Sequence, residues 1–363
     1  MSDLKRIALI DVDTSHAWVY GSYLQASGAA RVSHVVDSGL CRSRDYVERL
    51  ASALGAEIAS DPADLLGQID GAMLLGARYD NRLERAAALI DANVPLFFDK
   101  PAAGVVAQVD AVQRLLDRGY PLLCGSSLPL CRELARIRRV VQDQAPSGLA
   151  VLGCHEFFEH GIHAADIAMS LAPAAPREVF WSTFGPAQML WVSTDAPMQI
   201  ALGLEGVANW CVMANGASGS AVASLDLAFH RDCHYARLVA AFLDLVSERP
   251  VALRPHAHLD AIRILIAGAR SREEQRPAPI AELRPDDGFD GAAYAREYAE
   301  KLQDDPERDT LAPPAEVFTL PPDLAGVTKL TAGQRLRTRA RDLAARMLGE
   351  RGKRVACRVL TRV

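Results

Sequence analysis

Short apolar runs alternate with helical patterns over the first 125 residues, and this alternation is the feature that most constrains the fold. Each run has the length of a buried strand, and a stretch that suits a helix follows it. The runs lie at 5–10, 31–37, 70–75, 95–98 and 120–124, and the helical stretches at 17–26, 44–54, 61–66, 83–92 and 106–116. Parallel strands need such crossover helices. We therefore predict a doubly wound, Rossmann-like parallel sheet over residues 1–125.

The pattern changes after residue 125, where strands begin to follow one another without helices between them. Such an order is typical of an antiparallel sheet. Asn215-Gly216 lies between two of these strands and predicts a hairpin turn. The expected strands include 149–154, 207–214 and 218–229, and the expected helices are 163–171, 236–246 and 259–269. We predict an α+β domain over residues 126–283 with a largely antiparallel, open sheet.

Residues 284–363 have a third composition and are predicted to form a C-terminal extension. Acids are frequent at 286–309, and residues 331–363 hold ten Lys or Arg against two acids on an expected helix. A basic helix of this kind is one form of nucleic-acid patch, but this one has no interleaved aromatic residues. We favour a docking helix that pairs with an acidic stretch of its own or a neighbouring subunit.

Length, charge and cysteine usage narrow the functional classes. The chain has 363 residues, enough for two cores, and its net charge of -5 gives no general drive toward nucleic acid or membrane. No apolar run approaches the length of a membrane span, and the N-terminus lacks the pattern of a signal peptide. Seven scattered cysteines without a C-x-x-C motif are typical of a reducing compartment, so a cytoplasmic location is expected.

Residues 6–16 have the order strand, turn, helix start with which a dinucleotide-binding domain begins. The turn is usually G-x-G-x-x-G, because glycines let the backbone approach a diphosphate. Here the three glycine slots hold Asp11, Asp13 and His16. Like charges about 4 Å apart repel by roughly 1 kcal/mol in water and by more when partly buried. A diphosphate therefore requires that the aspartates face away, pair with a cation such as an arginine, or are bridged by a metal.

The same turn also contains groups that can hold a phosphate. Thr14, Ser15 and His16 can donate to phosphate from the helix start, and with Asp13 they form the predicted cofactor-binding turn. The simpler interpretation of these residue types is helix N-capping.

Two stretches carry side chains suited to catalysis. Lys100 follows a predicted strand, at the sheet edge where open α/β folds bind ligands; a solvated surface lysine is the plainer interpretation. Residues 155–166 hold three histidines and three acids. If the helix has begun by Glu159, then Glu159 and His163 share a face, and so do His163 and Asp166. An acid placed beside an imidazole favours acid–base chemistry.

Residues 155–166 also admit a metal site. His155, Glu159 and His163 are the candidate ligands, but the spacing of the histidines does not match His-Glu-x-x-His. A capped helix with satisfied polar residues is the structural alternative. We predict no metal, and keep these three residues as weak candidates.

Asp-Lys-Pro at 99–101, followed by Glu-x-Gly-x-His-x-x-Asp at 159–166, resembles the glucose–fructose oxidoreductase / inositol dehydrogenase / rhizopine catabolism (Gfo/Idh/MocA) family. The usual motifs of that family are Glu-Lys-Pro and Asp-x-Gly-x-His-x-x-Asp. The resemblance covers about residues 5–280. It implies an NAD(P)-dependent dehydrogenase of a sugar, cyclitol or related polyol, although a few members use bound NAD for redox-neutral chemistry such as glycoside cleavage.

The resemblance implies roles for the residues that match. Lys100 corresponds to the lysine near the nicotinamide and the reacting hydroxyl, and His163 to the general acid–base. Glu159 stands where the family has a substrate-binding Asp, and His160 joins it among the predicted substrate-binding residues. Asp37, which closes the second strand, matches the acid that binds the adenosine ribose.

Some features depart from the family or leave alternatives open. Arg42 and Arg44 near the second strand suit a 2′-phosphate, so NAD and NADP both remain possible. The family run Thr-Pro-x-x-x-His is Ala77–Arg82 here, without its proline and histidine. The altered turn at 11–16 makes a lyase, hydrolase or isomerase that has lost the dinucleotide the main alternative. A non-catalytic scaffold, with 284–363 as its partner surface, is the second.

The favoured prediction is an oxidoreductase acting on a secondary alcohol or ketone of a small polar metabolite, with Lys100, Glu159 and His163 between the two domains. The expected partners are a small-molecule substrate and further copies of the chain, since the sheet of the second domain pairs with another subunit in this family. Neither nucleic acid nor membrane is expected.

Overall fold

A six-stranded parallel sheet forms the N-terminal part of the computed structural model, which describes residues 4–304 except 144–145, 155, 206, 218, 226 and 252. The strand order is β3-β2-β1-β4-β5-β6, so the order reverses between β1 and β4, where sheets of this kind bind ligands at their carboxyl ends. The elements are β1 (Lys5–Ile10), α1 (His16–Ala26), β2 (Ala30–Val36), α2 (Arg44–Leu54), β3 (Glu57–Ala59), β4 (Gly71–Leu74), α3 (Arg82–Arg85), α4 (Ala87–Asp91), β5 (Leu96–Phe98), α5 (Val106–Asp117) and β6 (Leu122–Cys124). The predicted Rossmann-like sheet is confirmed.

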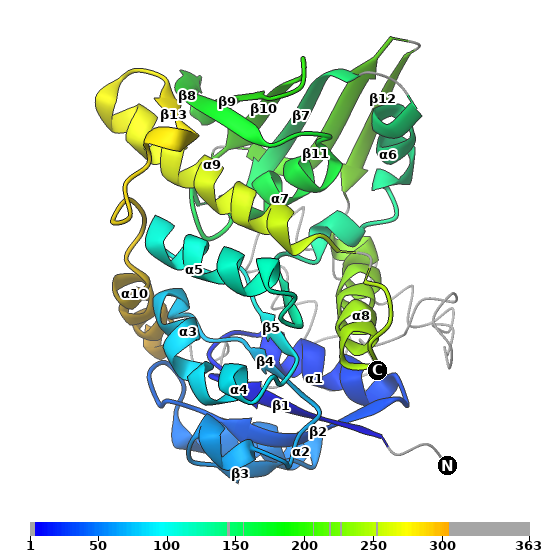
Figure 1. The fold of residues 1–363 in the computed structure, drawn as a ribbon, viewed down its shortest axis with the longest axis vertical. Coiled ribbons are helices and arrows are strands. Elements are labelled where there is room, and N and C mark those ends of the chain that lie inside the picture. Colours follow the sequence, from blue (N-terminus) through cyan, green and yellow to red (C-terminus); the bar gives the residue numbers. More distant parts are fainter. Residues whose placement is uncertain are drawn as a thin grey trace.

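Alternate residues of β1 explain why helices cover both faces of this sheet (Figure 1). Ile7 and Leu9 belong to a buried cluster with α1, α2 and α8 (Leu227–Val246), whereas Ala8 and Ile10 belong to the cluster that contains α5. Successive side chains of a strand point to opposite faces, so an unbroken apolar strand needs cover on each side.

The second sheet has seven strands in the order β12-β11-β7-β10-β9-β8-β13 and is largely antiparallel, as predicted. Its pair β7–β10 is parallel, and the other described pairs are antiparallel. Its strands are β7 (Pro146–Cys154), β8 (Pro176–Phe184), β9 (Ala187–Thr194), β10 (Gln199–Leu204), β11 (Val207–Gly216), β12 (Gly219–Leu225) and β13 (Ala278–Pro279), and the helices of this part are α6 (Leu134–Asp143), α7 (Gly161–Leu171) and α9 (Pro255–Glu274).

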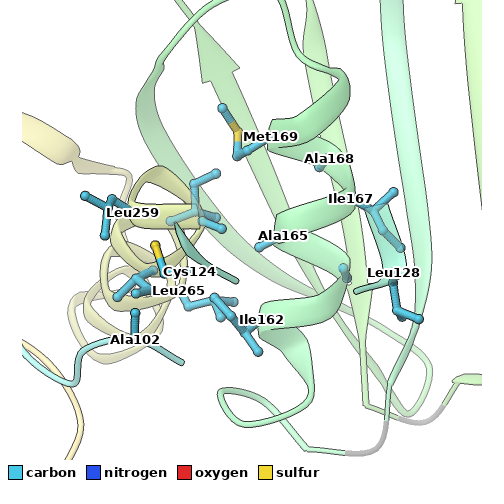
Figure 2. Close-up of a cluster of buried hydrophobic side chains, with 14 of the residues drawn as sticks. Ala102, Cys124, Leu128, Ile162, Ala165, Ile167, Ala168, Met169, Leu259 and Leu265 are labelled. Carbon is cyan, nitrogen blue, oxygen red and sulfur yellow. The ribbon is translucent and has the colours of Figure 1, made fainter. Parts of the chain in front are cut away.

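Helices α7 and α9 cover one face of the second sheet and pack on each other (Figure 2). Ile162 and Ala165 of α7 and Leu265 of α9 are fully buried in their contact. Small residues on α7 let the two helices approach closely. Cys124, at the end of β6, lies in the same cluster, so this core joins the two sheets. Helix α7 thereby places its first turn beside the carboxyl ends of the N-terminal strands.

The opposite face of the second sheet carries a row of exposed apolar side chains. Phe180 pairs with Trp191, and Met213 pairs with Val222, in one continuous register across the sheet. The exposed fractions are 47% for Trp191 and 59% for Val222. The homo-oligomer expected by analogy stays a prediction. Among the described residues, no helix combines the length and apolarity that crossing a bilayer requires.

Helix α8 is placed differently from the sequence expectation. It follows the second sheet along the chain, but Phe242 and Val246 pack against the first sheet, beside Phe97 and Gly71. A side chain at position 71 would meet these two residues, which is why the strand begins with glycine there. Helix α8 is therefore part of the hydrophobic core of the N-terminal sheet.

Three local predictions were wrong. The hairpin pairs Gly216 with Gly219, so its turn lies two residues after Asn215-Gly216. The strand expected at 218–229 ends at Leu225, because α8 begins at Leu227. The helix expected at 83–92 is two short helices that meet at Ala86, whose backbone φ and ψ of -93° and -3° interrupt the helix.

Helix α10 (Gly291–Asp304) belongs to the predicted C-terminal extension and packs on the N-terminal part. The rings of Tyr294 and Tyr79 lie 5.9 Å apart, and Lys301 lies 3.6 Å from Glu156. The docking helix expected at 331–363 lies outside the described residues.

Candidate active site

The turn that follows β1 accommodates its first aspartate through an arginine. Asp11 has a φ of 53°, in the left-handed region that glycine usually occupies in this turn. Nε and Nη2 of Arg85 each donate to the Asp11 carboxylate at 2.9 Å, and Ser38 N donates at 3.1 Å. The Asp11 side chain is 8% exposed. Its charge is therefore neutralised by a bidentate ion pair with Arg85. Pairing with an arginine is one of the arrangements that would let this turn bind a diphosphate.

The second aspartate points into the protein. Asp13 is 1% exposed, its Oδ2 accepts from Ala77 N at 2.9 Å, and its backbone oxygen accepts from Arg42 Nε at 2.8 Å. Among the described residues, Oδ1 has no hydrogen-bond partner. Burial raises the pKa of Asp13 to about 7; the Ala77 hydrogen bond opposes this shift, and the charges of Asp37 and Asp11 add to it. A carboxyl group in this state carries little negative charge below neutral pH.

Replacing Asp13 by asparagine is expected to remove a pH dependence of stability. In the wild type the folded state holds a proton on Asp13 up to about pH 7, whereas the unfolded chain releases it near pH 4, so the free energy of unfolding falls as pH rises through this window. The loss is on the order of 2–4 kcal/mol. The asparagine side chain cannot ionise but still accepts from Ala77 N. Urea unfolding at pH 5 and pH 8.5 should show Asp13→Asn gaining stability relative to wild type at the higher pH; a constant difference would contradict this account.

The other residues of the predicted cofactor turn are partly used by the turn itself. Thr14 Oγ1 accepts from His16 N at 3.3 Å and donates to Leu75 O at 3.4 Å. Asp37 accepts from Val12 N at 2.9 Å and from Gly39 N at 2.8 Å. Ser15 precedes α1 without a side-chain capping bond and is exposed. The capping alternative thus holds for Thr14, and the cofactor roles of these residues stay predictions.

His16, in the third glycine slot, forms a close pair with Asp99. Its Nδ1 lies 2.6 Å from Asp99 Oδ2, and the two side chains are 13% and 3% exposed. The hydroxyl of Tyr235 lies 3.4 Å from Nε2, and the rings of Tyr20 and Tyr235 lie 4.9 and 5.5 Å from the imidazole. Burial alone would raise the pKa of Asp99, but His16, Arg82 and Lys100 hold it below its ordinary value. Asp99 is therefore an anion at neutral pH.

Lys100 extends toward the second domain. Its Nζ donates to the backbone oxygen of Glu159 at 3.0 Å, and the peptide bond to Pro101 is cis. Burial lowers the pKa of Lys100, and the Asp99 and Glu159 charges offset only part of that effect. Glu159 itself has a raised pKa, because burial and the neighbouring Glu156 outweigh the attraction of Lys100. The lysine predicted at this edge is therefore partly buried and bonded to the backbone of Glu159, so the interpretation as a fully solvated surface lysine is wrong.

His163 lies in the first turn of α7, next to the lysine. Its Nδ1 lies 2.6 Å from Ser126 Oγ. Burial, the Lys100 charge and the neighbouring histidines lower the pKa of His163 well below its ordinary value. The imidazole is therefore neutral at physiological pH. The structure brings Lys100, Glu159 and His163 together, and their catalytic and substrate-binding roles stay predictions.

Two expectations about the acids near His163 were wrong. Helix α7 begins at Gly161, so Glu159 precedes the helix and shares no helical face with His163. Asp166 does not contact His163, because its Oδ1 lies 2.7 Å from Nδ1 of His258 and its Oδ2 accepts from Ser126 N at 2.7 Å. This arrangement is favourable because the Asp166 carboxylate satisfies two buried hydrogen-bond donors, Ser126 N and the imidazole of His258.

His258 shows how Asp166 supports the site. Ala102 N donates to Nε2 of His258 at 3.1 Å, so the ring proton is on Nδ1 and is donated to Asp166. Both side chains are nearly fully buried. This series of hydrogen bonds connects the loop after Lys100 with α9, then with α7, and then with Ser126, whose hydroxyl contacts His163. Asp166 is thus a positioning residue.

The remaining candidates lie at the rim. Nδ1 of His160 lies 2.9 Å from Glu156, and both side chains are about two-fifths exposed. The substrate role of His160 stays a prediction. His155 lies outside the described residues, and the residues that the structure describes contain no group of three His, Cys, Asp or Glu side chains placed to hold a metal.

Sequence reasoning missed several residues of this arrangement. It assigned His16 to phosphate binding and did not pair it with Asp99, and it did not consider Ser126, His258 or Arg85. A usable signal existed for the first pair: both residues follow strands of one parallel sheet, whose carboxyl ends meet at one edge. No local signal marks partners such as Asp11 and Arg85, which lie 74 residues apart.

Comparison with known proteins supports the fold. The sequence matches no protein-family model and no curated protein. The structure is similar to a myo-inositol dehydrogenase from Corynebacterium glutamicum (TM-score 0.63, 16% identity, covering 76% of this chain and 99% of that one). It is also similar to a myo-inositol 2-dehydrogenase from Lactobacillus plantarum (0.65, 11%, 76% and 99%) and to scyllo-inositol dehydrogenase from Lactobacillus casei with bound NAD(H) and scyllo-inositol (0.64, 10%, 77% and 100%). The chain therefore has the two-domain fold of the Gfo/Idh/MocA dehydrogenases.

Proposed function

We propose that the protein is an NAD(P)-dependent oxidoreductase that acts on a secondary alcohol or ketone of a sugar, cyclitol or related small polar metabolite. The observation that carries this proposal is the meeting of Lys100 and His163 at the carboxyl edge of the parallel sheet. A partly buried ammonium can stabilise an alkoxide, and a neutral imidazole can accept a proton. Solved dehydrogenases of inositols share the fold and one of them holds NAD(H).

The turn at 11–16 is compatible with a dinucleotide despite its aspartates. Arg85 neutralises Asp11, and Asp13 is turned into the core with a raised pKa, so neither presents a free charge to a diphosphate. Helix α1 adds the positive potential of its N-terminus. The residues that would hold the cofactor are the turn 13–16, with Asp37 at the ribose end. Arg42 is buried and donates to the backbone oxygen of Asp13, whereas Arg44 is exposed, so Arg44 is the arginine that leaves NAD and NADP both possible.

The chemistry then divides among these groups. A bound nicotinamide accepts or returns a hydride at the carbon that bears the hydroxyl. Lys100 orients the hydroxyl and stabilises the negative charge that develops on its oxygen, while an imidazole of the site takes the hydroxyl proton. Glu159, with its raised pKa, suits hydrogen bonding to a second hydroxyl of a polyol.

The proposal predicts binding of a nicotinamide cofactor. Titration calorimetry with NAD and NADP should give micromolar dissociation constants for at least one, and a panel of inositols and sugars should produce absorbance at 340 nm. A folded protein that binds neither NAD nor NADP would contradict the proposal. Small molecules released from the purified protein, identified by mass, provide an independent check.

A redox-neutral enzyme on the same scaffold is the second candidate, and the His16–Asp99 pair favours it. The pair gives the site an acid–base group in a place where dinucleotide folds carry glycine. Elimination or isomerisation next to a carbonyl needs such a group and Lys100, with no net change in oxidation state. Activity in the absence of added or co-purified nicotinamide would distinguish it.

A further inference from the structure

Two imidazoles of the candidate site, those of His16 and His163, have different partners. His163 faces the neutral hydroxyl of Ser126 at 2.6 Å, whereas His16 faces the carboxylate of Asp99 at the same distance. The two histidines are close enough that the charge of His16 affects the pKa of His163. The His16 ring is therefore held by a hydrogen bond to a carboxylate, whereas the His163 ring is held by a hydroxyl.

The geometry leaves Nε2 of His16 as the reactive nitrogen. Asp99 is anionic and accepts a hydrogen bond, so the proton of the neutral ring is on Nδ1. Nε2 then carries a lone pair, with the Tyr235 hydroxyl 3.4 Å away. Burial and Asp99 raise the pKa of Tyr20 well above its ordinary value, so this second hydroxyl stays protonated.

A purely structural role of the His16–Asp99 pair leaves one oxygen of the Asp99 carboxylate unexplained. Asp99 Oδ1 is buried and has no hydrogen-bond partner among the described residues. A buried carboxylate oxygen without a partner is unfavourable by about 1–3 kcal/mol or more. Arg82, which donates to the backbone oxygen of Asp99, leaves this side-chain oxygen open.

We propose that His16, oriented by Asp99, is the residue that takes the proton from the substrate and returns it. For an alcohol, Nε2 of His16 accepts the hydroxyl proton and becomes part of an imidazolium that faces Asp99. The hydrogen of the C–H bond would leave with its electron pair as hydride to an oxidised nicotinamide, and the C–O single bond would become the C=O bond of a ketone. The hydride transfer in this step rests on the proposed function. The proton transfer to His16 does not, because an enolisation needs the same proton transfer without any hydride acceptor.

The test uses His16→Gly, which restores the usual glycine, with His163→Gln for comparison and His34→Gln as a control on β2. On the alcohol that the wild type oxidises, His16→Gly is expected to lower kcat about 10²–10⁴-fold with the KM for the alcohol within threefold of the wild-type value. Added imidazole should restore at least tenfold of the lost rate, because the glycine leaves space for it. Asp99→Asn should lower kcat while the KM stays within threefold, because the His16 ring then loses the carboxylate that orients it.

Two results would overturn the proposal: turnover of His16→Gly within threefold of wild type, or a loss that imidazole does not restore. If the wild type oxidises no alcohol with either NAD or NADP, the proposed function fails, and a second measurement decides on His16. The ketone of myo-inositol, incubated in D2O without a nicotinamide, should take up deuterium at its α-carbon with the wild type and His34→Gln. His16→Gly should abolish this uptake; equal uptake, or none with the wild type, rejects the role of His16.

Discussion

Replacing Asp166 by alanine is expected to lower the free energy of unfolding by about 4 kcal/mol. The substitution leaves Ser126 N and the Nδ1 proton of His258 buried without an acceptor, and each such donor costs about 1–3 kcal/mol. Urea unfolding followed by circular dichroism measures the change.

Asp110→Ala is the matched control, because Asp110 also pairs with a residue of α9, Arg263, but is 47% exposed. Exposed ion pairs contribute about 0–1 kcal/mol, so this variant should stay near wild type. Asp166→Asn keeps one acceptor and should fall between the two. A loss below about 1 kcal/mol for Asp166→Ala would show that the Asp166–His258 contact does not hold the domains as described.

Replacing Lys100 by methionine is expected to reduce turnover about 10²–10³-fold, the usual effect of removing one donor to a developing oxyanion. Methionine keeps the length of the apolar stem and removes the ammonium that donates to Glu159. Affinity for ADP-ribose, the part of the cofactor without the nicotinamide, should change less than threefold in calorimetry, since the turn at 11–16 is untouched. Steady-state rates of ketone reduction by NAD(P)H provide the measurement.

Lys5→Met serves as the control for this variant. Lys5 is the first residue of β1, at the end of that strand opposite the turn at 11–16. Its turnover should equal that of the wild type. A Lys100→Met protein that retains a third or more of wild-type turnover would remove the lysine from the proposed mechanism.

The parallel sheet was predictable because its signal is local. Each strand is an unbroken apolar run, and each helix pattern between two runs excludes an antiparallel connection. Lys100 and His163 were predictable for the same reason: one follows a strand at the ligand-binding edge, and the other lies in a dense group of acids and histidines. A resemblance in motif order then placed the two together.

Other features depend on partners that are distant in the sequence. Asp166 was expected to orient His163, but the buried His258 of α9 competes for its carboxylate, and 92 residues separate the two. The hairpin turn moved because strand register across three neighbouring strands outweighs the preference of one Asn-Gly pair. The aspartates of the opening turn indicated a negative charge that needs compensation. Arg85 compensates the charge of Asp11, and it lies on α3, far away in the sequence.

The position of α8 has a consequence for how the two halves of the chain can move. Residues from the C-terminal half of the chain complete the hydrophobic core under β1, β4 and β5, so the N-terminal sheet depends on α8 for its cover. A hinged movement that keeps Phe242 buried must therefore carry α8 with the N-terminal sheet. Exchanging the halves between proteins of this fold would likewise require α8 to travel with that sheet.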